Sequence, residues 1–223
     1  MSSGTPAPPP RPLGPRIVNW LVGAAMALLA IAFFFPLVWM VLSSFKTDAA
    51  IFRSPFALPE TIDLSVWVEA WEVGNLGKYA LNSAIVTGAS VFLILLIASL
   101  AAFGFSRYRF RGRSLAMGLF ALGLLLPLQS YFIAQSNLFT QLEITDTRWA
   151  LIIPYTAMGL PLATFLLKVF MDGLPDELFD VARIDGASDL RTYSRVALPL
   201  LRPGLATVAI FSALAAWNEF LLA

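Results

Sequence analysis

Long apolar runs separated by short charged stretches dominate the pattern of this chain. A helix rises ~1.5 Å per residue, so about 20 apolar residues cross the ~30 Å hydrocarbon core of a bilayer. By this measure the sequence predicts five membrane-spanning helices, with expected ranges 17–44, 79–106, 115–134, 149–168 and 203–223. We expect Pro127 to kink the third of these helices. The predicted fold class is all-α, a polytopic transmembrane helix bundle.

The segments outside these helices divide the chain further. Residues 1–16 are rich in proline and serine and carry no periodic apolar residues, so we expect a disordered tail ahead of one transmembrane domain at 17–223. The polar connection 46–78 is expected to hold short amphipathic helices, for example around 64–73.

A charged segment, 172–200, interrupts the apolar pattern and predicts two short helices joined at a glycine. Pro175 and the acidic residues after it suit a helix start. Gly186 can end that helix in a left-handed conformation, and Ser188 can cap a second helix that closes near Pro199. One narrow apolar stripe is expected on the first helix, formed by Leu174, Leu178, Val181 and Ala182. An ordinary amphipathic segment lying on lipid headgroups is the alternative interpretation.

Composition supports a membrane protein and narrows the chemistry. The chain is 58% hydrophobic and 13% charged, with a mean hydropathy of +0.76. It has no cysteine and no histidine, which excludes disulfides, thiol chemistry, the common zinc sites and histidine proton relays. No phosphate-binding GxxxxGK[ST] loop is present. We therefore expect no catalytic residue, no metal site and no enzyme activity, and the net charge of +1 gives no sign of nucleic-acid binding.

Lysine and arginine predict the orientation. Four of these residues fall on one side of the predicted spans, namely Lys46, Arg53, Lys78 and Arg148, and the rest of the 15 fall on the other. The positive-inside rule then places the N-terminus, the arginine-rich loop 107–113 and the charged segment in the cytoplasm.

The charged segment also carries a family resemblance. Asp180-Val181-Ala182, three residues, Gly186, nine residues and then Val196-Ala197-Leu198-Pro199 resemble the EAA motif of the membrane subunits of binding-protein-dependent ABC importers. The stretches 184–188 and 199–203 resemble the carbohydrate-uptake branch, the relatives of the maltose permease subunits. Further similar stretches are 44–46, 82–83, 101–107 and 217–220. Asp180, Val181 and Val196 depart from the usual Glu, Ala and Ile, while keeping charge sign or apolarity.

The resemblance implies a type I ABC importer permease fold in a bacterial or archaeal cytoplasmic (inner) membrane. It implies a cytoplasmic coupling helix at 174–188 that docks on an ATPase through Asp180, Val181, Ala182, Ile184, Asp185, Gly186, Ala187, Leu198 and Pro199. The implied partners are a second, different permease chain, two ABC ATPase subunits that bind ATP and Mg, and an external solute-binding protein. Family members usually carry a sixth span, which we expect to be missing here.

Polar residues near the predicted spans are candidates for a sugar path, because sugars are bound by planar polar groups and aromatic faces. The candidates are Gln129, Tyr131, Gln135, Trp217, Asn218 and Glu219. Interhelical hydrogen bonding is the alternative role for each, and Glu219 could instead be solvated at the outer interface. The alternative function is an ATP-independent secondary transporter or channel, for which the sequence offers Glu219 as the carboxylate within a span.

Overall fold

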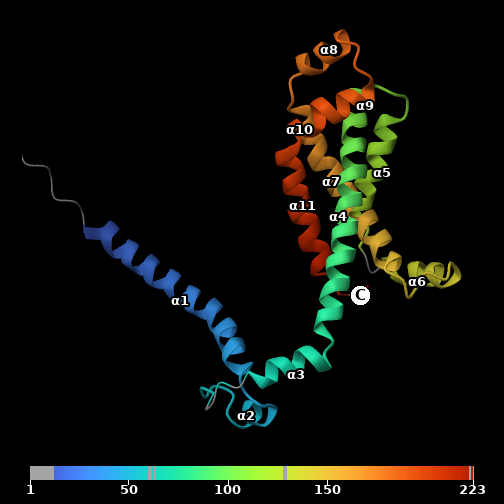
Figure 1. The fold of residues 1–223 in the computed structure, drawn as a ribbon. Coiled ribbons are helices and arrows are strands. Elements are labelled where there is room, and N and C mark those ends of the chain that lie inside the picture. The colour runs from blue at the N-terminus through green and yellow to red at the C-terminus, as the bar shows by residue number, and fades with distance from the viewer. Residues whose placement is uncertain (1–12, 60–61, 63, 128–129, 221, 223) are drawn as a thin grey trace, which may run out of the picture. The chain divides into compact units, whose positions relative to one another are not determined.

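A computed structural model describes residues 13–59, 62, 64–127, 130–220 and 222, and the regular secondary structure of these residues is helical (Figure 1). The chain divides into two compact units, residues 1–76 and 77–223. The predicted all-α class is confirmed.

The first unit contains one long helix and two short ones: α1 (Leu13–Ser43), α2 (Asp48–Arg53) and α3 (Ser65–Val73). α3 confirms the helix expected around 64–73. The predicted tail is wrong for residues 13–16, which form the first turn of α1. Proline is tolerated in a first turn because its missing N–H would have no partner there, so Pro15 does not exclude helix. Residues 1–12 lie outside the described residues.

A buried lysine orders the connection between α1 and α2. The Lys46 ammonium donates to the backbone oxygens of Ser54 at 3.2 Å and Pro55 at 3.3 Å. Trp39 Nε1 donates to the same Pro55 oxygen at 2.8 Å. The lysine and the tryptophan therefore hold the chain after α2 against the end of α1.

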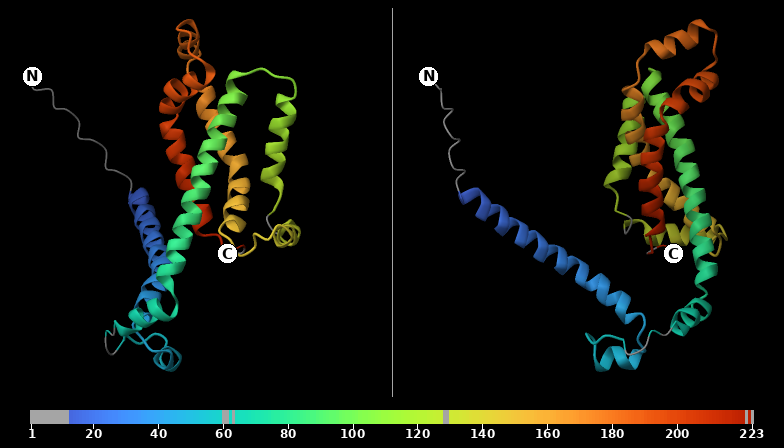
Figure 2. Two further views of the ribbon diagram at one scale, coloured as in Figure 1. Left: turned by 45° about the vertical axis from the view of Figure 1, so that its right-hand side comes forward. Right: turned by 60° about the vertical axis from the view of Figure 1, so that its left-hand side comes forward.

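The second unit contains a bundle of helices that lie side by side (Figures 1 and 2). Its elements are α4 (Leu76–Arg107), α5 (Arg113–Leu125), α6 (Phe132–Gln141), α7 (Trp149–Asp172), α8 (Glu177–Ile184), α9 (Asp189–Thr192), the π-helix η2 (Tyr193–Ala197), α10 (Leu198–Leu200) and α11 (Arg202–Trp217). The bundle consists of α4, α5, α7 and α11. The loop after α4 and the segment α8–α10 lie at one end of it, and α6 and the end of α11 lie at the other (Figure 2).

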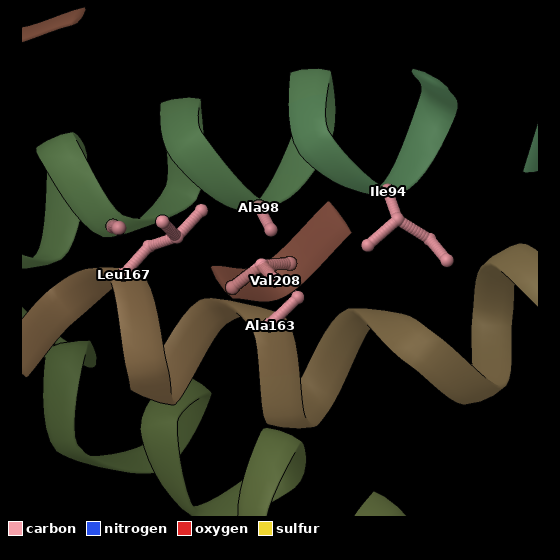
Figure 3. Packing of buried hydrophobic residues seen from close by; sticks show 6 residues of the cluster. Ile94, Ala98, Ala163, Leu167 and Val208 are labelled. Atoms are coloured by element: carbon pink, nitrogen blue, oxygen red, sulfur yellow. The ribbon is translucent and has the colours of Figure 1, made fainter. Parts of the chain in front are cut away.

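Small residues let the bundle helices approach closely. Ala98 of α4 and Ala163 of α7 are buried beside larger residues (Figure 3). These are Ile94 of α4, Leu167 of α7 and Val208 of α11. In membranes, such small residues allow backbones to pack at short range. Glycines do the same at the edges of this core. A Cβ on Gly159 would lie 2.4 Å from the Ile94 side chain, and one on Gly204 would lie 2.8 Å from the Phe170 ring.

Among the residues that the structure describes, three helices are long and apolar enough to cross a membrane, namely α1 from Ile17, α4 and α7. A fourth candidate is the pair 189–200 and 202–217, which is bent by 74°. The predicted single span at 115–134 is wrong. α5 has 13 residues and extends only about 20 Å at ~1.5 Å per residue. Pro127 ends the helix rather than kinking it, since a residue before proline is pushed to extended backbone and Leu126 has φ −80° and ψ 114°.

The predicted last span, 203–223, also ends earlier than expected. α11 stops at Trp217. Asn218 Nδ2 donates to the Leu214 oxygen at 2.8 Å, and the Glu219 carboxylate accepts the Leu222 N–H at 3.1 and 3.2 Å. Such side chain–backbone bonds compete with the helical ladder. Residues 221 and 223 lie outside the described part of the chain.

Candidate functional site

The candidate site is the segment 172–200, and its first helix ends in a defined turn. In α8 the N–H of Gly186 donates to the Arg183 oxygen at 3.0 Å, and the N–H of Ala187 donates to the Ala182 oxygen at 2.9 Å. These two bonds are the Schellman motif, which needs a left-handed residue just after the helix. Gly186 supplies it with φ +69°. The spacing from Ala182 to Gly186 in the sequence motif therefore has a physical basis, because these residues are the carbonyl acceptor and the left-handed residue of one turn.

α8 has two apolar faces rather than the one predicted stripe. Phe179 and Ala182 are buried, while the side chains of Leu178, Val181 and Ile184 are exposed, Ile184 to 84%. The predicted stripe is wrong in joining Ala182 with Leu178 and Val181. A short helix with an inner face on the bundle and an outer apolar face can bind a second surface.

Charged residues surround the exposed face. Asp180 and Arg183 form an exposed ion pair at 3.7 Å within the helix, and Asp185 is the C-cap. α8 begins at Glu177 with Asp176 at the N-cap, so Pro175 precedes the helix instead of lying in its first turn. The carboxylates of the first turn still face the positive end of the helix dipole.

The second helix starts where expected but does not close where expected. Ser188 is the N-cap of α9, with an extended backbone and without a side-chain cap hydrogen bond. The helical path then continues through η2 and through Leu198 and Pro199 in α10. Pro199 is accommodated at the N-terminal end of α10 rather than closing the helix, and Pro203 lies at the start of α11.

A buried cluster joins the site to the bundle. Its members are Phe103 of α4, Met171 of α7, Phe179 of α8, Tyr193 and Ala197 of η2, and Leu201 between α10 and α11. Within it, the Phe103 and Tyr193 ring centroids are 5.6 Å apart, and the Tyr193 hydroxyl is hydrogen-bonded to Ser99 Oγ of α4 at 2.7 Å. Sequence reasoning missed Phe179 and Tyr193 as anchors of the site. The three-residue spacing of Phe179 and Ala182 was the available signal for the inner face.

Tyr108 extends this attachment outside the bundle. Burial, a hydrogen bond with Asp189 and the negative charge of that carboxylate raise the pKa of Tyr108 to about 12. Its ring also packs edge-on against Phe103, with centroids 5.8 Å apart. The phenol therefore links the loop after α4 to the start of α9.

The structure does not gather the predicted path residues into one place. Tyr131 and Gln135 lie at the start of α6, and Trp217 and Asn218 lie at the end of α11. Gln129 lies outside the described residues. A cavity of about 300 Å³ among α4, α7 and α11 is lined by Glu219 and by none of Tyr131, Gln135, Trp217 and Asn218.

Glu219 is bound to the bundle rather than simply solvated. Tyr155 Oη of α7 donates to its carboxylate at 2.6 Å, and both residues line the cavity, whose other walls are mostly apolar, including Ile94, Val208 and Phe211. Tyr155 was not among the predicted residues. The involvement of Glu219 and the other candidates in a solute path stays a prediction.

Comparison with known proteins supplies the context for this geometry. The family model described as "Binding-protein-dependent transport system inner membrane component" matches residues 94–223. The chain is 39% identical over 202 residues to the diacetylchitobiose uptake system permease protein NgcG of Streptomyces coelicolor, a match covering 89% of this chain and 66% of that protein. It is 35% identical over 205 residues to the trehalose/maltose transport system permease protein MalG of Thermococcus litoralis, covering 91% of this chain and 73% of the relative.

A solved structure shares the fold. It is the crystal structure of a bacterial ABC transporter involved in the import of the acidic polysaccharide alginate, with a TM-score of 0.81 at 22% identity. The match covers 95% of this chain and 75% of that one. The chain thus spans from 66% to 75% of the lengths of these three proteins.

Proposed function

Because this chain belongs to the family of inner-membrane components of binding-protein-dependent transport systems, we propose that it is the membrane-spanning subunit of an ATP-driven importer. In this role the chain carries out no bond-making step. It provides part of the path through the membrane and converts motion of a partner ATPase into motion of its own helices. ATP and Mg belong to the ATPase subunits.

The observation that carries the proposal is the exposed face of α8. Leu178, Val181 and Ile184 form an apolar surface on a helix that the Schellman turn at Gly186 holds at a fixed angle. An amphipathic helix that lays an apolar face into a groove of a partner is a recurring mode of protein recognition. In this proposal the partner that supplies the groove is the ATPase. Asp180 and Asp185 lie at the edge of the contact, and Ala187 lies beside the turn.

The proposed mechanism is a rigid-body movement. When the ATPase dimer closes on ATP, the docked α8 moves with it, and the cluster around Phe179, Phe103 and Tyr193 passes that movement to α4, α7 and α11. The spans then switch between inward- and outward-facing states, a rotation about packed interfaces.

The same proposal fixes the orientation and the partners. The arginine-rich loop 107–113 and α8 lie at one end of the bundle, and the positive-inside rule assigns that end, together with the N-terminus, to the cytoplasm. The partners are a second, different permease chain, two ABC ATPases and an external solute-binding protein. The names of the relatives, which refer to diacetylchitobiose and to trehalose and maltose, support a sugar, oligosaccharide or related polyol as the solute.

The test is the substitution Gly186→Val in the assembled importer. A β-branched residue is strained at φ +69°, since the left-handed region costs roughly 1–2 kcal/mol for an L-residue, and relief of that strain re-aims the chain after α8. We expect the ATPase to co-purify as with the wild type, and ATP-dependent uptake of the oligosaccharide held by the binding protein to be abolished.

Gly186→Asn is the matched control, because asparagine tolerates the left-handed conformation. It should keep most of the uptake. Unaltered uptake in the valine variant would overturn the docking role of α8.

A further inference from the structure

Arg107, the last residue of α4, differs from the arginines that follow it. Its side chain is 9% exposed, whereas Arg109 and Arg111 are exposed. A topology signal accounts for a cluster of arginines in a cytoplasmic loop, but it does not account for the burial of one of them. A buried guanidinium is costly unless its charge and its N–H groups find partners.

The partners of Arg107 lie on two other elements. Its Nη1 forms an ion pair with the Asp176 carboxylate, at the N-cap of α8. Its Nη2 donates to the backbone oxygen of Met171 at 2.7 Å and to that of Leu174 at 3.2 Å. Its Cζ lies 3.7 Å from the centroid of the buried Phe179 ring.

These contacts join three helices through one side chain. Met171 lies in the last turn of α7 and Leu174 follows the end of that helix, where the negative end of the helix dipole favours a cation. Asp176 and Phe179 hold the start and the inner face of α8. The arginine therefore fixes the chain that leaves α7 and enters α8, with α4 as the support.

We propose that Arg107 is the positioning residue of α8, which makes α8 and α4 move as one body. This inference rests on the proposed coupling function and adds to it the connection by which motion of α8 reaches the bundle. The residues of α8 contact the ATPase in that function. Arg107 acts behind them, through Asp176 and Phe179.

The chemistry requires arginine. The planar guanidinium presents donors in a fork, so two nitrogens can serve Asp176 and the α7 carbonyls at once while the flat face stacks on Phe179. A lysine ammonium is a single point charge on a flexible stem and cannot do all three. A positive charge alone is thus insufficient to hold α8, and Arg107→Lys tests this because it keeps the charge and removes the fork of donors.

The experiment measures the position of α8 relative to α4 by distances between spin labels. The chain has no cysteine, so Arg183→Cys on α8, whose side chain is exposed and is not part of the outer apolar face, and the exposed Leu100→Cys on α4 give one label pair in a complex whose other subunits lack cysteine. We expect Arg107→Met to widen the distance distribution at least two-fold. Arg107→Lys should give an intermediate width. Arg109→Met, which removes the same charge from an exposed site in the same loop, should leave the width unchanged.

A functional measurement separates positioning from a merely structural role. In complexes without the label cysteines, we expect Arg107→Met to retain ATPase co-purification and basal ATP hydrolysis while uptake per ATP hydrolysed falls at least ten-fold. The uptake per ATP hydrolysed by Arg107→Lys should lie between the values of Arg107→Met and the wild type. Arg109→Met should match the wild type.

Asp176→Ala is the second variant, for use if Arg107→Met does not accumulate. The Asp176 carboxylate is 84% exposed, so we expect its loss to leave the fold intact and to widen the distribution of spin-label distances. An unchanged width in Arg107→Met, or in Asp176→Ala where that variant decides, overturns the proposal. Failure of the wild-type chain to bind any ATPase would instead overturn the proposed function, and the label distances would still decide the role of Arg107.

Discussion

At the scale of single residues, polar groups at the end of α4 decide how the segment 172–200 is held. Arg107 and Tyr108 are consecutive, yet they contact different helices. Arg107 pairs with Asp176 at the N-cap of α8, and Tyr108 is hydrogen-bonded with Asp189 at the start of α9.

The phenol of Tyr108 predicts a dependence on alkaline pH. Its pKa is raised to about 12, above the ordinary value of about 10. The protonated form is therefore favoured in the folded state, and its contribution to stability is fully present below pH ~10 and lost as the pH rises toward ~12. We expect the difference in tyrosinate absorbance between wild type and Tyr108→Phe to show a titration near pH 12. Asp189→Asn should lower that midpoint, and a wild-type midpoint at the ordinary value would contradict the buried contact.

At the scale of elements, helix–helix distances in the bundle depend on residues that lack bulk. Gly204 near the start of α11 faces the ring and the Cβ of Phe170 on α7. Gly104 in α4 is also helical, and a Cβ added there meets nothing within 4 Å. The two glycines therefore separate the cost of crowding from the general cost of glycine in a helix.

Gly204→Ala should destabilise the protein. The new methyl group would lie 2.8 Å from two ring atoms and 3.3 Å from the Cβ of Phe170, so the whole side chain must move, and overpacking of this kind costs about 1–3 kcal/mol. Gly104→Ala should be neutral or stabilising by up to about 1 kcal/mol, because alanine is the better helix former. The thermal unfolding midpoints of the purified complexes test both, and equal midpoints for the two variants would contradict the close contact of α7 and α11.

At the scale of the whole molecule, the ends of the second unit are chemically different. Arg109, Arg111, Arg113 and the charged segment lie at one end, and the loop between α6 and α7 lies at the other. If the bundle crosses the membrane as proposed, these two ends face opposite compartments.

Single cysteines test that arrangement. Arg111→Cys and Arg183→Cys should react with a membrane-impermeant maleimide only after the cells are opened, because both positions are expected in the cytoplasm. Asp146→Cys, in the loop before α7, should react in intact cells. All three positions are exposed, so access to solvent within the chain is not limiting. Labelling of Arg183→Cys from outside would reverse the proposed orientation, and opposite results for Arg183 and Arg111 would contradict the fold.

The sequence alone determined the all-α membrane class, the extents of α4 and α7 to within a few residues, the left-handed Gly186 and the short helix α3. These features follow from local or periodic signals: the length of an apolar run, a glycine where a turn needs positive φ, and amphipathic spacing. The family and the position of its motif were likewise visible in residue spacing, because the Ala182–Gly186 interval is the geometry of one helix end.

The tertiary structure decided what depends on neighbours distant in the chain. Apolarity could not show that Pro127 separates α5 from α6, that α11 ends at Trp217, or that α8 divides into a buried and an exposed face. Three contacts join residues more than 60 positions apart in the chain. They are the Arg107–Asp176 ion pair, the Tyr155–Glu219 hydrogen bond and the Ser99–Tyr193 hydrogen bond. Hydropathy measures how a residue interacts with its solvent, whereas these contacts depend on which helices pack together.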